Sequence, residues 1–259
     1  MVQSHAAIVL DGKEYLVTSR LQPIIEREGL GSIGGLVERL RGEPHGQLAR
    51  RVVEAMATNE TLFFRDVDVF ESLRRHVLPE LIEARRGERQ LTVWSAACST
   101  GQEPYSVAML LDDQFAAALR GWQVNLVASD LSAEALERAR HGSYSQLEVD
   151  RGLPPGYRLR YFRREPNGWR IEERIRRMVE LRQMNLKSEW QLGGPAPDLV
   201  LLRNVLYYFA GSDKKAILAR VRRTVRPRGV LLVGSTETVV EDDGFVATRV
   251  GQADVYRSA

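Results

Sequence analysis

The stretch from Leu91 to Tyr105 passes from an apolar run, through a turn of small residues, to the expected start of a helix. Between Ser95 and Gly101 the side chains have little bulk, so a ligand could lie directly against the backbone. In an open α/β sheet, such a strand–turn–helix unit binds nucleotide-like ligands. The stretch has neither the dinucleotide pattern G-x-G-x-x-G nor the phosphate loop G-x-x-x-x-G-K-S/T. This absence indicates a nucleoside without a pyrophosphate, with S-adenosylmethionine (SAM) as the candidate, although a turn without a ligand could have the same residues.

A carboxylate ends the next apolar run, which extends from Val124 to Asp130. An acid at the end of the second strand of such a fold can accept hydrogen bonds from both ribose hydroxyls. Its separation from Gly101 exceeds the usual value of about 20 residues, and the loop 117–122 can absorb the excess. Asp130 could instead only cap the helix expected over 132–140. The order of strand, acid and helix favours the ribose role.

Polar residues also follow a later apolar run, 198–202. Arg203 and Asn204 come directly after it, and the burial of such groups is costly unless they are paired. A ligand at the carboxyl edge of the sheet would provide a partner, and an ordinary salt bridge of Arg203 is the alternative. Asn185 and Leu186 take the equivalent position after a neighbouring apolar run. The pattern therefore places all four residues at one edge of the sheet.

The segment from Thr58 to Arg65 combines two hydroxyls, an amide and an arginine with two aromatic residues. It lies at the junction between a helical pattern and an α/β pattern. The alternative to a binding role is structural. Thr58 or Asn59 would then cap a helix whose Phe63 and Phe64 enter the core.

Cys98 is the single cysteine of the chain, which excludes an internal disulfide and fits a reducing compartment. No histidine lies near it in the sequence, so we expect a small turn residue and not a nucleophile. The four histidines are scattered without the spacing of metal ligands, and we expect no metal centre.

Composition indicates an ordinary globular chain. Its 259 residues, 44% hydrophobic and 27% charged, suit one large or two small domains. No apolar run approaches the length of a membrane span, and the N-terminus lacks the pattern of a secretory signal. We therefore expect a cytoplasmic protein without membrane insertion.

Arginine is unevenly distributed, although the formal net charge is only +3. One short segment contains Arg158, Arg160, Arg163, Arg164, Arg170, Arg174, Arg176, Arg177 and Arg182. Such a segment could contact RNA, an acidic protein surface or solvent. Interleaved acids weaken the nucleic-acid interpretation and favour a self-paired surface; they are Glu165, Glu172, Glu173 and Glu180.

Apolar periodicity divides the chain into two parts. The clearest helical stripe in the first part is Ile33, Leu36, Val37 and Leu40. From Leu91 onward, apolar runs alternate with helical stripes, which is typical of a parallel α/β sheet. We expect a small all-helical N-terminal domain, residues 1–75, followed by an α/β domain, residues 76–259.

An insertion interrupts the α/β alternation over about residues 145–187. Asn167-Gly168 between two possible strands is a strong hairpin signal. Residues 178–184 then alternate between apolar and polar side chains. We expect a small antiparallel β-subdomain here, before the α/β pattern resumes.

Five motifs occur in one order: T-N-E-T-L-F-F-R, W-S-A-A-C-S-T-G-Q-E-P-Y-S, A-S-D-L-S, R-G-L-P and R-N-V-L-Y-Y-F. Together they resemble the CheR family of chemoreceptor glutamate methyltransferases. Tyr15 to Arg65 is similar to the family's helical domain, and Leu91 to Tyr256 to its Rossmann-like, SAM-dependent methyltransferase domain with an inserted β-subdomain. The resemblance implies transfer of the methyl group of SAM to glutamate carboxylates on cytoplasmic helices of chemoreceptors. S-adenosylhomocysteine (SAH) is the implied product, and no nucleic acid or metal is implied.

The resemblance also assigns roles to residues at matching motif positions. Arg65 and Tyr208 are the implied catalytic residues, with Tyr208 near the transferred methyl group. Glu103 and Asp130 would bind the amino-acid and ribose ends of SAM. The full implied cofactor set is Asn59, Thr61, Arg65, Glu103, Asp130, Asn185, Leu186, Arg203 and Asn204.

Two departures from the family pattern matter. Some members have a longer loop in the β-subdomain that docks a receptor's C-terminal peptide, whereas this chain has only Glu165 to Trp169, so tethered docking is not expected. Gln102 stands where some members have a second acid, and Glu103 remains as the ligand. Two alternatives stay open: a SAM-dependent methyltransferase of another protein or of RNA, and a non-catalytic module that binds SAM or SAH.

Overall fold

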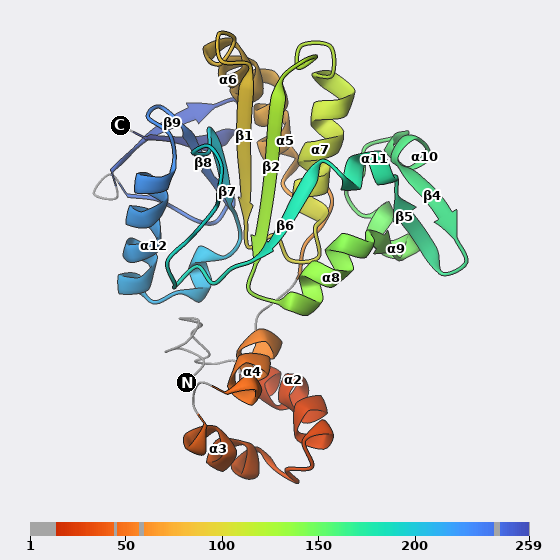
Figure 1. Ribbon diagram of the computed structural model, residues 1–259, viewed down its shortest axis with the longest axis vertical. Coiled ribbons are helices and arrows are strands. Elements are labelled where there is room, and N and C mark those ends of the chain that lie inside the picture. Colours follow the sequence, from red (N-terminus) through yellow and green to blue (C-terminus); the bar gives the residue numbers. More distant parts are fainter. Residues whose placement is uncertain (1–13, 44–45, 57–59, 241–243, 259) are drawn as a thin grey trace.

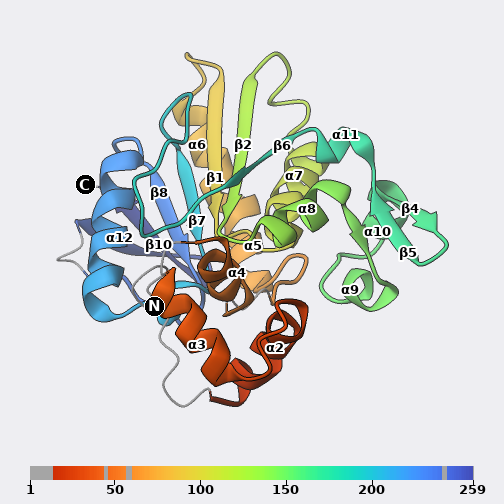
Figure 2. The same ribbon diagram turned by 60° about the horizontal axis from the view of Figure 1, so that its bottom comes forward.

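The computed structural model describes residues 14–43, 46–56, 60–240 and 244–258. A group of helices lies at one end of a seven-stranded sheet, and a small three-stranded sheet flanks one side of it (Figure 1, Figure 2). None of the helices in these ranges is both long and apolar enough to cross a membrane.

The N-terminal helices form a core of their own. They are α2 Glu14–Arg27, α3 Ile33–Gly42 and α4 Gln47–Met56. Ser32 caps α3, because its side chain accepts a hydrogen bond from the N–H of Gly35. Leu36 and Leu40 of the expected stripe are buried in this core. Ile33 and Val37 remain 37% and 40% exposed, because so few helices cannot cover the whole stripe.

The large sheet has the strand order β6-β2-β1-β7-β8-β10-β9. Its strands are β1 Gln90–Ala96, β2 Gln123–Asp130, β6 Val179–Gln183, β7 Leu199–Leu202, β8 Val230–Val233, β9 Phe245–Val250 and β10 Ala253–Ser258. The first five run parallel, and β10 is antiparallel to both β8 and β9. The chain moves outward from β1 through β2 to β6 and then returns to β7, beside β1. Such a reversal opens a ligand crevice at the carboxyl ends of the strands.

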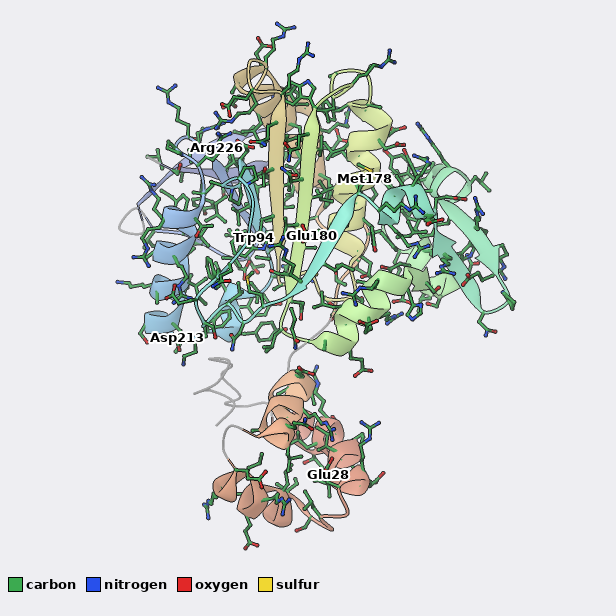
Figure 3. The ribbon with its side chains drawn as sticks, viewed as in Figure 1. Glu28, Trp94, Met178, Glu180, Asp213 and Arg226 are labelled. Atoms are coloured by element: carbon green, nitrogen blue, oxygen red, sulfur yellow. The ribbon has the colours of Figure 1, made fainter. Side chains whose placement is uncertain are left out.

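Helices cover both faces of this sheet, which confirms the expected α/β class. They are α5 Val67–Ser72, a π-helical turn Leu73–Val77, α6 Leu78–Ala84, α7 Gln102–Gln114, α8 Ala133–His141 and α12 Gly211–Thr224. Side chains alternate along each strand, so neighbouring residues enter different cores. Val93 packs in the core that contains residues of α5, α6 and α7, whereas Trp94 lies in the sheet's other core, to which Leu218 of α12 also belongs. Figure 3 shows Trp94 among the strands.

The inserted segment forms the expected antiparallel hairpin. In the small sheet, β5 Gly168–Ile171 pairs with both β3 Ser143–Tyr144 and β4 Phe162–Glu165. Three short helices complete it: α9 Gln146–Asp150, α10 Tyr157–Tyr161 and α11 Glu173–Arg176. The prediction that residues 178–184 belong to this antiparallel unit was wrong. β6 pairs parallel with β2 and is an edge strand of the large sheet, which alternation of side chains alone cannot reveal.

The arginine-rich segment is largely self-paired. Its ion pairs are Arg158–Asp150, Arg160–Asp113, Arg163–Glu172, Arg170–Glu165, Arg174–Asp112, Arg177–Glu173 and Arg182–Glu180. The Arg164 guanidinium lies over the ring of Trp169 and donates a hydrogen bond to the side-chain oxygen of Gln146. These contacts favour the self-paired interpretation over a surface that binds RNA.

The chain has two separate hydrophobic cores, and the boundary between them falls between Met56 and Phe63. Met56 belongs to the helical core, whereas Phe63 packs with the strands of the large sheet. The division expected at residues 75 and 76 stays a prediction, and this position lies within consecutive helices from Val67 to Ala84. We propose the boundary between the cores as the more natural domain limit.

Candidate active site

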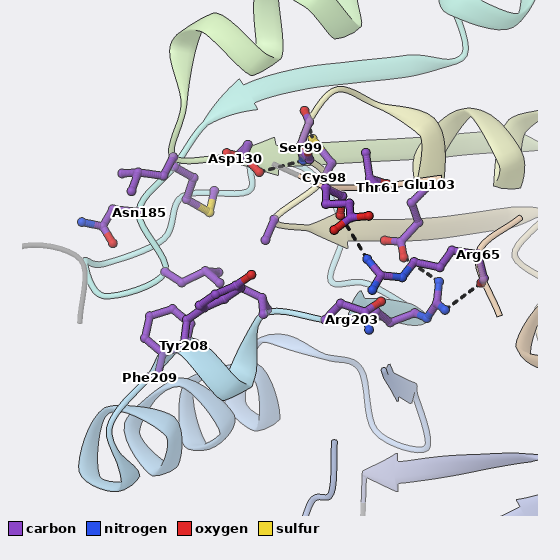
Figure 4. A pocket seen from close by; sticks show the side chains of 17 residues that line it. Thr61, Arg65, Cys98, Ser99, Glu103, Asp130, Asn185, Arg203, Tyr208 and Phe209 are labelled. Atoms are coloured by element: carbon purple, nitrogen blue, oxygen red, sulfur yellow. Dashed lines mark hydrogen bonds and ion pairs between the residues drawn. The ribbon is translucent and has the colours of Figure 1, made fainter. Parts of the chain in front are cut away.

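A pocket opens at the carboxyl ends of the parallel strands and contains about 910 Å³ of space, part of it open to solvent (Figure 4). The described residues of the implied set meet here: Thr61, Arg65, Glu103, Asp130, Asn185, Leu186, Arg203, Asn204 and Tyr208 all line it. Asn59 lies outside the described residues.

The turn after β1 forms one wall of the pocket with its backbone. Ala97 and Ser99 have φ angles of 59° and 52°, in a left-handed region that costs a non-glycine residue roughly 1–3 kcal/mol. The N–H of Cys98 is bonded to the Ser129 carbonyl at 2.9 Å, which ties the turn to β2. Gly101 has a φ of 94°, and a Cβ there would lie 2.8 Å from the Cβ of Ala139. Such local strain is typical of a binding site.

Asp130 lies at the end of β2, as predicted, and is buried. Its two carboxylate oxygens accept the N–H of Ser99 at 2.7 Å and the N–H of Ser132 at 2.9 Å. The N-cap of α8 is Ser132, whose hydroxyl accepts the N–H of Ala135, so capping is not the role of Asp130. Burial raises the pKa of Asp130 above its usual value, and the backbone N–H groups of Ser132, Ser99 and Leu131 act in the opposite direction.

Arg203 joins two carboxylates behind the pocket wall. Its Nη1 donates to Glu103 Oε2 at 2.9 Å, and its Nη2 donates to Asp66 Oδ2 at 2.7 Å and to the Arg65 carbonyl at 2.8 Å. Ser95 donates to the other oxygen of Glu103 at 2.7 Å. The salt-bridge alternative for Arg203 is therefore confirmed, and the same residue also lines the pocket.

Arg65 reaches the pocket from the segment that links the two cores. Its Nη1 donates to the Glu60 carbonyl at 3.0 Å. Phe63 and Phe64 are buried, as the structural alternative expected, and the N–H of Phe64 is bonded to the Ser106 hydroxyl at 2.9 Å. Residues 60–66 form no helix, and α5 begins only at Val67. The buried aromatic pair thus anchors a non-helical segment that carries Arg65.

Tyr208 ends a short 3-10 helix, Leu206–Tyr208, that follows β7. Tyr208 lines the pocket, whereas Tyr207 is 50% exposed. The two ring centroids are 4.4 Å apart. Burial, and then its hydrogen bond with Tyr208, raises the pKa of Tyr207 above its usual value. Asn204 adopts a left-handed φ of 57° at the start of this turn.

The loop after β6 carries Asn185 and Leu186. Its backbone is held from outside, because Arg220 of α12 donates from Nη1 to the carbonyls of Leu186 at 2.9 Å and Ser188 at 2.6 Å. Trp190 donates to the Leu186 carbonyl at 3.2 Å, and the Arg220 guanidinium lies 5.0 Å from the centroid of its ring. These contacts fix the two pocket residues from the side opposite the cavity.

Cys98 is buried in the turn and lines the pocket. Burial, reinforced by the charges of Asp130 and Glu103, raises the pKa of its thiol well above the usual value. The thiol therefore stays protonated at neutral pH and is a poor nucleophile. Among the residues that the structure describes, no cluster of His, Cys, Asp or Glu side chains has the arrangement of a metal site.

Sequence reasoning missed two acids that hold residues of the site in place. Asp66 follows Arg65 directly and holds Arg203, but an acid beside an arginine carries little signal. Glu237 follows β8 in the segment Gly234-Ser-Thr-Glu and holds the backbone after β7. Its place in the turn that follows a buried strand was the signal available.

The donors and acceptors of the pocket fit SAM. Asp130 accepts the N–H groups of Ser99 and Ser132, and the lone pairs that remain can accept ribose hydroxyls. Glu103 likewise keeps lone pairs for an ammonium group. The apolar side chains of Met184, Leu186 and Phe209 line the same cavity and suit an adenine ring.

Comparison with known proteins agrees with this fit. A family model described as "CheR methyltransferase, SAM binding domain" matches residues 59–253. The chain is 43% identical over 262 residues to chemotaxis protein methyltransferase 1 of Pseudomonas aeruginosa, with coverage of 99% of this chain and 94% of the relative. It is 34% identical over 243 residues to the chemotaxis protein methyltransferase of Escherichia coli, with coverage of 92% and 81%. The chain therefore belongs to the CheR family of SAM-dependent methyltransferases.

Proposed function

We propose that the chain transfers the methyl group of SAM to glutamate side chains on cytoplasmic helices of chemoreceptors and forms methyl esters. The observation that carries this proposal is one pocket that combines Glu103 and Asp130, suited to SAM, with Arg65 and Tyr208, suited to a carboxylate. The names of the relatives, chemotaxis protein methyltransferases, support the same substrate class. We place this activity in the cytoplasm.

The chemistry demands positioning more than acid–base catalysis. A glutamate side chain has a reference pKa of about 4.3 and is already an anion at neutral pH. When bound, SAM supplies an electrophilic methyl group. Orientation of the reacting groups can contribute roughly 7–11 kcal/mol. The task of this chain is therefore to hold the carboxylate in line with the methyl group and to exclude water.

Two side chains are suited to hold the carboxylate. Arg65 can donate to it from the pocket lining, because its guanidinium donates to the Glu60 carbonyl and forms no ion pair with an acid of the described residues. A tight, buried ion pair would lower the nucleophilicity of the glutamate carboxylate, so a partly exposed arginine suits the role. Tyr208 contributes a hydroxyl from the opposite side of the pocket (Figure 4).

The helical part offers a basic approach to this pocket. A groove between α2, α4 and α8 reaches Thr100 of the turn after β1. Its charged lining has one more arginine than glutamate; the residues are Arg20, Arg27, Arg51 and Arg138 with Glu28, Glu54 and Glu134. Such a surface attracts an acidic helix bundle and steers it toward the pocket.

The deciding experiment incubates the protein with methyl-labelled SAM and membranes from its own cell. Glutamyl methyl esters release methanol in mild base, whereas methylated lysines and bases do not. We expect base-labile methanol from the membrane fraction. Label that resists base, or that enters RNA, would support a different methyltransferase. Calorimetric binding of SAH without any transfer would support a non-catalytic binding module.

A further inference from the structure

Glu237 is a buried acid that the proposed chemistry does not use. It follows β8, is 8% exposed, and is absent from the residues that line the pocket. Its carboxylate nevertheless accepts three backbone N–H groups. Oε2 accepts those of Asn204 and Gly234, both at 2.7 Å, and Oε1 accepts that of Leu206 at 2.6 Å.

These three bonds join the ends of two neighbouring strands. Leu202 of β7 lies beside Val233 of β8 in the parallel register, so the turns that follow them are adjacent. Glu237 returns from the second turn to hold the first. There it fixes Asn204 in its left-handed conformation and the start of the 3-10 helix that ends at Tyr208.

The packing around the carboxylate is tight. A Cβ at Gly234 would lie 2.6 Å from Asn204 Nδ2 and 2.8 Å from Glu237 Oε2, so even a methyl group would displace these groups. On its other side, the same turn is tied by Arg203 to Glu103 and Asp66. The turn is thus held between two sets of charged contacts.

We propose that Glu237 is a positioning residue for methyl transfer, which acts through the backbone to place Asn204 and Tyr208. This inference rests on the proposed function of the pocket. Only a carboxylate offers acceptors on both oxygens. A glutamine has one carbonyl oxygen, so its NH₂ group would face a buried N–H and leave that donor unpaired.

The test compares Glu237→Gln with Asp198→Asn. Asp198 is a fully buried carboxylate too, and it accepts the N–H of Thr92 at 2.8 Å, but it lies next to the amino end of β7, outside the pocket. Both variants lose a buried acceptor and are expected to lower Tm. Normalisation to the number of SAH-binding sites removes the effect of unfolded protein from each rate.

We expect Glu237→Gln to lower the normalised kcat by roughly tenfold to a hundredfold, since a displacement of about 1 Å has this effect on catalysis. The dissociation constant for SAH is expected to rise by a smaller factor, because Asp130 and Glu103 stay in place. Amide hydrogen exchange of the segment 203–209 is expected to accelerate. Asp198→Asn is expected to leave both the normalised kcat and the exchange of this segment as in the unmodified chain.

A normalised kcat within about twofold of the unmodified chain, or unchanged exchange over 203–209, would overturn the positioning role. If Glu237→Gln does not fold, Gly234→Ala decides the question, because its methyl group disturbs the same contacts from outside. An unmodified chain that forms no base-labile ester contradicts the proposed function instead. The exchange comparison does not depend on that outcome.

Discussion

Arg203 and Glu103 are bonded at 2.9 Å although 100 residues separate them along the chain. Arg203 follows β7, and Glu103 lies in the first turn of α7, so their contact joins two elements that border the pocket. Only 1% of the Arg203 side chain and 11% of the Glu103 side chain are exposed. Asp66 binds the same guanidinium, and one arginine therefore orients two acids.

Removal of Arg203 is expected to weaken both the fold and the binding of cofactor. In Arg203→Met, two carboxylates lose their shared partner, and the loss of one member of a buried pair costs about 3–5 kcal/mol. Urea unfolding and calorimetry with SAH measure the two effects. Arg257→Met is the matched control, because its pair with Glu80 is more exposed and contributes below about 1 kcal/mol. Equal losses in both variants would show that burial of the pair is unimportant.

Removal of the Arg65 side chain is expected to impair catalysis far more than cofactor binding. Arg65→Ala should abolish formation of the methyl ester, because no other described cation of the pocket is free to orient the incoming carboxylate while Arg203 is engaged by two acids. SAH affinity should fall much less. Initial rates of base-labile methanol release and calorimetry give the two numbers. Arg75→Ala, which removes a 64% exposed arginine paired with Glu71, serves as control. Near-normal turnover of Arg65→Ala would contradict the catalytic assignment.

Much of this site follows from residues placed after buried strands. Asp130 ends an apolar run, Arg203 and Asn185 each come directly after one, and parallel strands bring such positions to one edge of the sheet. Sequence could not show the partners that join distant segments. Arg203 binds Asp66, and Glu237 binds the N–H groups of Asn204 and Leu206, through folding of loops that carry no periodic signal.

The fold was predictable in class but not in one detail of pairing. Alternation over residues 178–184 predicts a strand, yet it gives no information about the neighbour of that strand. The structure pairs this strand with β2, so that Gln183 lies beside Asp130. Asn185 reaches the pocket because of this parallel register.

Binding of cofactor is expected to weaken with acid through Asp130. Burial raises its folded-state pKa, so protonation begins at a higher pH than for an ordinary aspartate, whose pKa is about 3.9. The ionised carboxylate accepts ribose hydroxyls best. SAH affinity should therefore fall as the pH decreases from neutral toward the raised pKa. Calorimetry across this range tests the trend, and Asp130→Asn should bind weakly with little dependence on pH.

The raised pKa of Asp130 also predicts how the stability of the fold depends on pH. A folded-state pKa above the unfolded value means that the folded chain binds the proton more tightly, so the free energy of unfolding falls as pH rises through that window. Asp130→Asn should remove this decrease. Urea unfolding of both chains, measured without SAH from about pH 4 to neutral, tests it. A decrease that persists in Asp130→Asn would assign it to another group.

Arg220 is expected to control affinity from outside the pocket. Arg220→Ala releases the carbonyls of Leu186 and Ser188, so the loop that carries Asn185 gains freedom and SAH affinity decreases by about tenfold, equivalent to about 1.4 kcal/mol. Trp190 fluorescence should also change, because the guanidinium no longer lies over its ring. Arg223→Ala, an exposed position on the same helix, is the control. Unchanged affinity in Arg220→Ala would show that the loop is held by other contacts.

Methylation of the receptor is expected to depend steeply on salt if the helical part steers the substrate. Charges separated by more than about 8–10 Å are screened at physiological ionic strength, so kcat/KM for the receptor should fall as salt is added. Arg27→Glu and Arg39→Glu, both at exposed positions, should lower kcat/KM and flatten this dependence, with SAH affinity unchanged. Arg163→Glu reverses a 78% exposed charge on the inserted subdomain and is the matched control. A salt dependence that is flat in the unmodified chain, or equally reduced by the control, would place the approach of the receptor elsewhere on the surface.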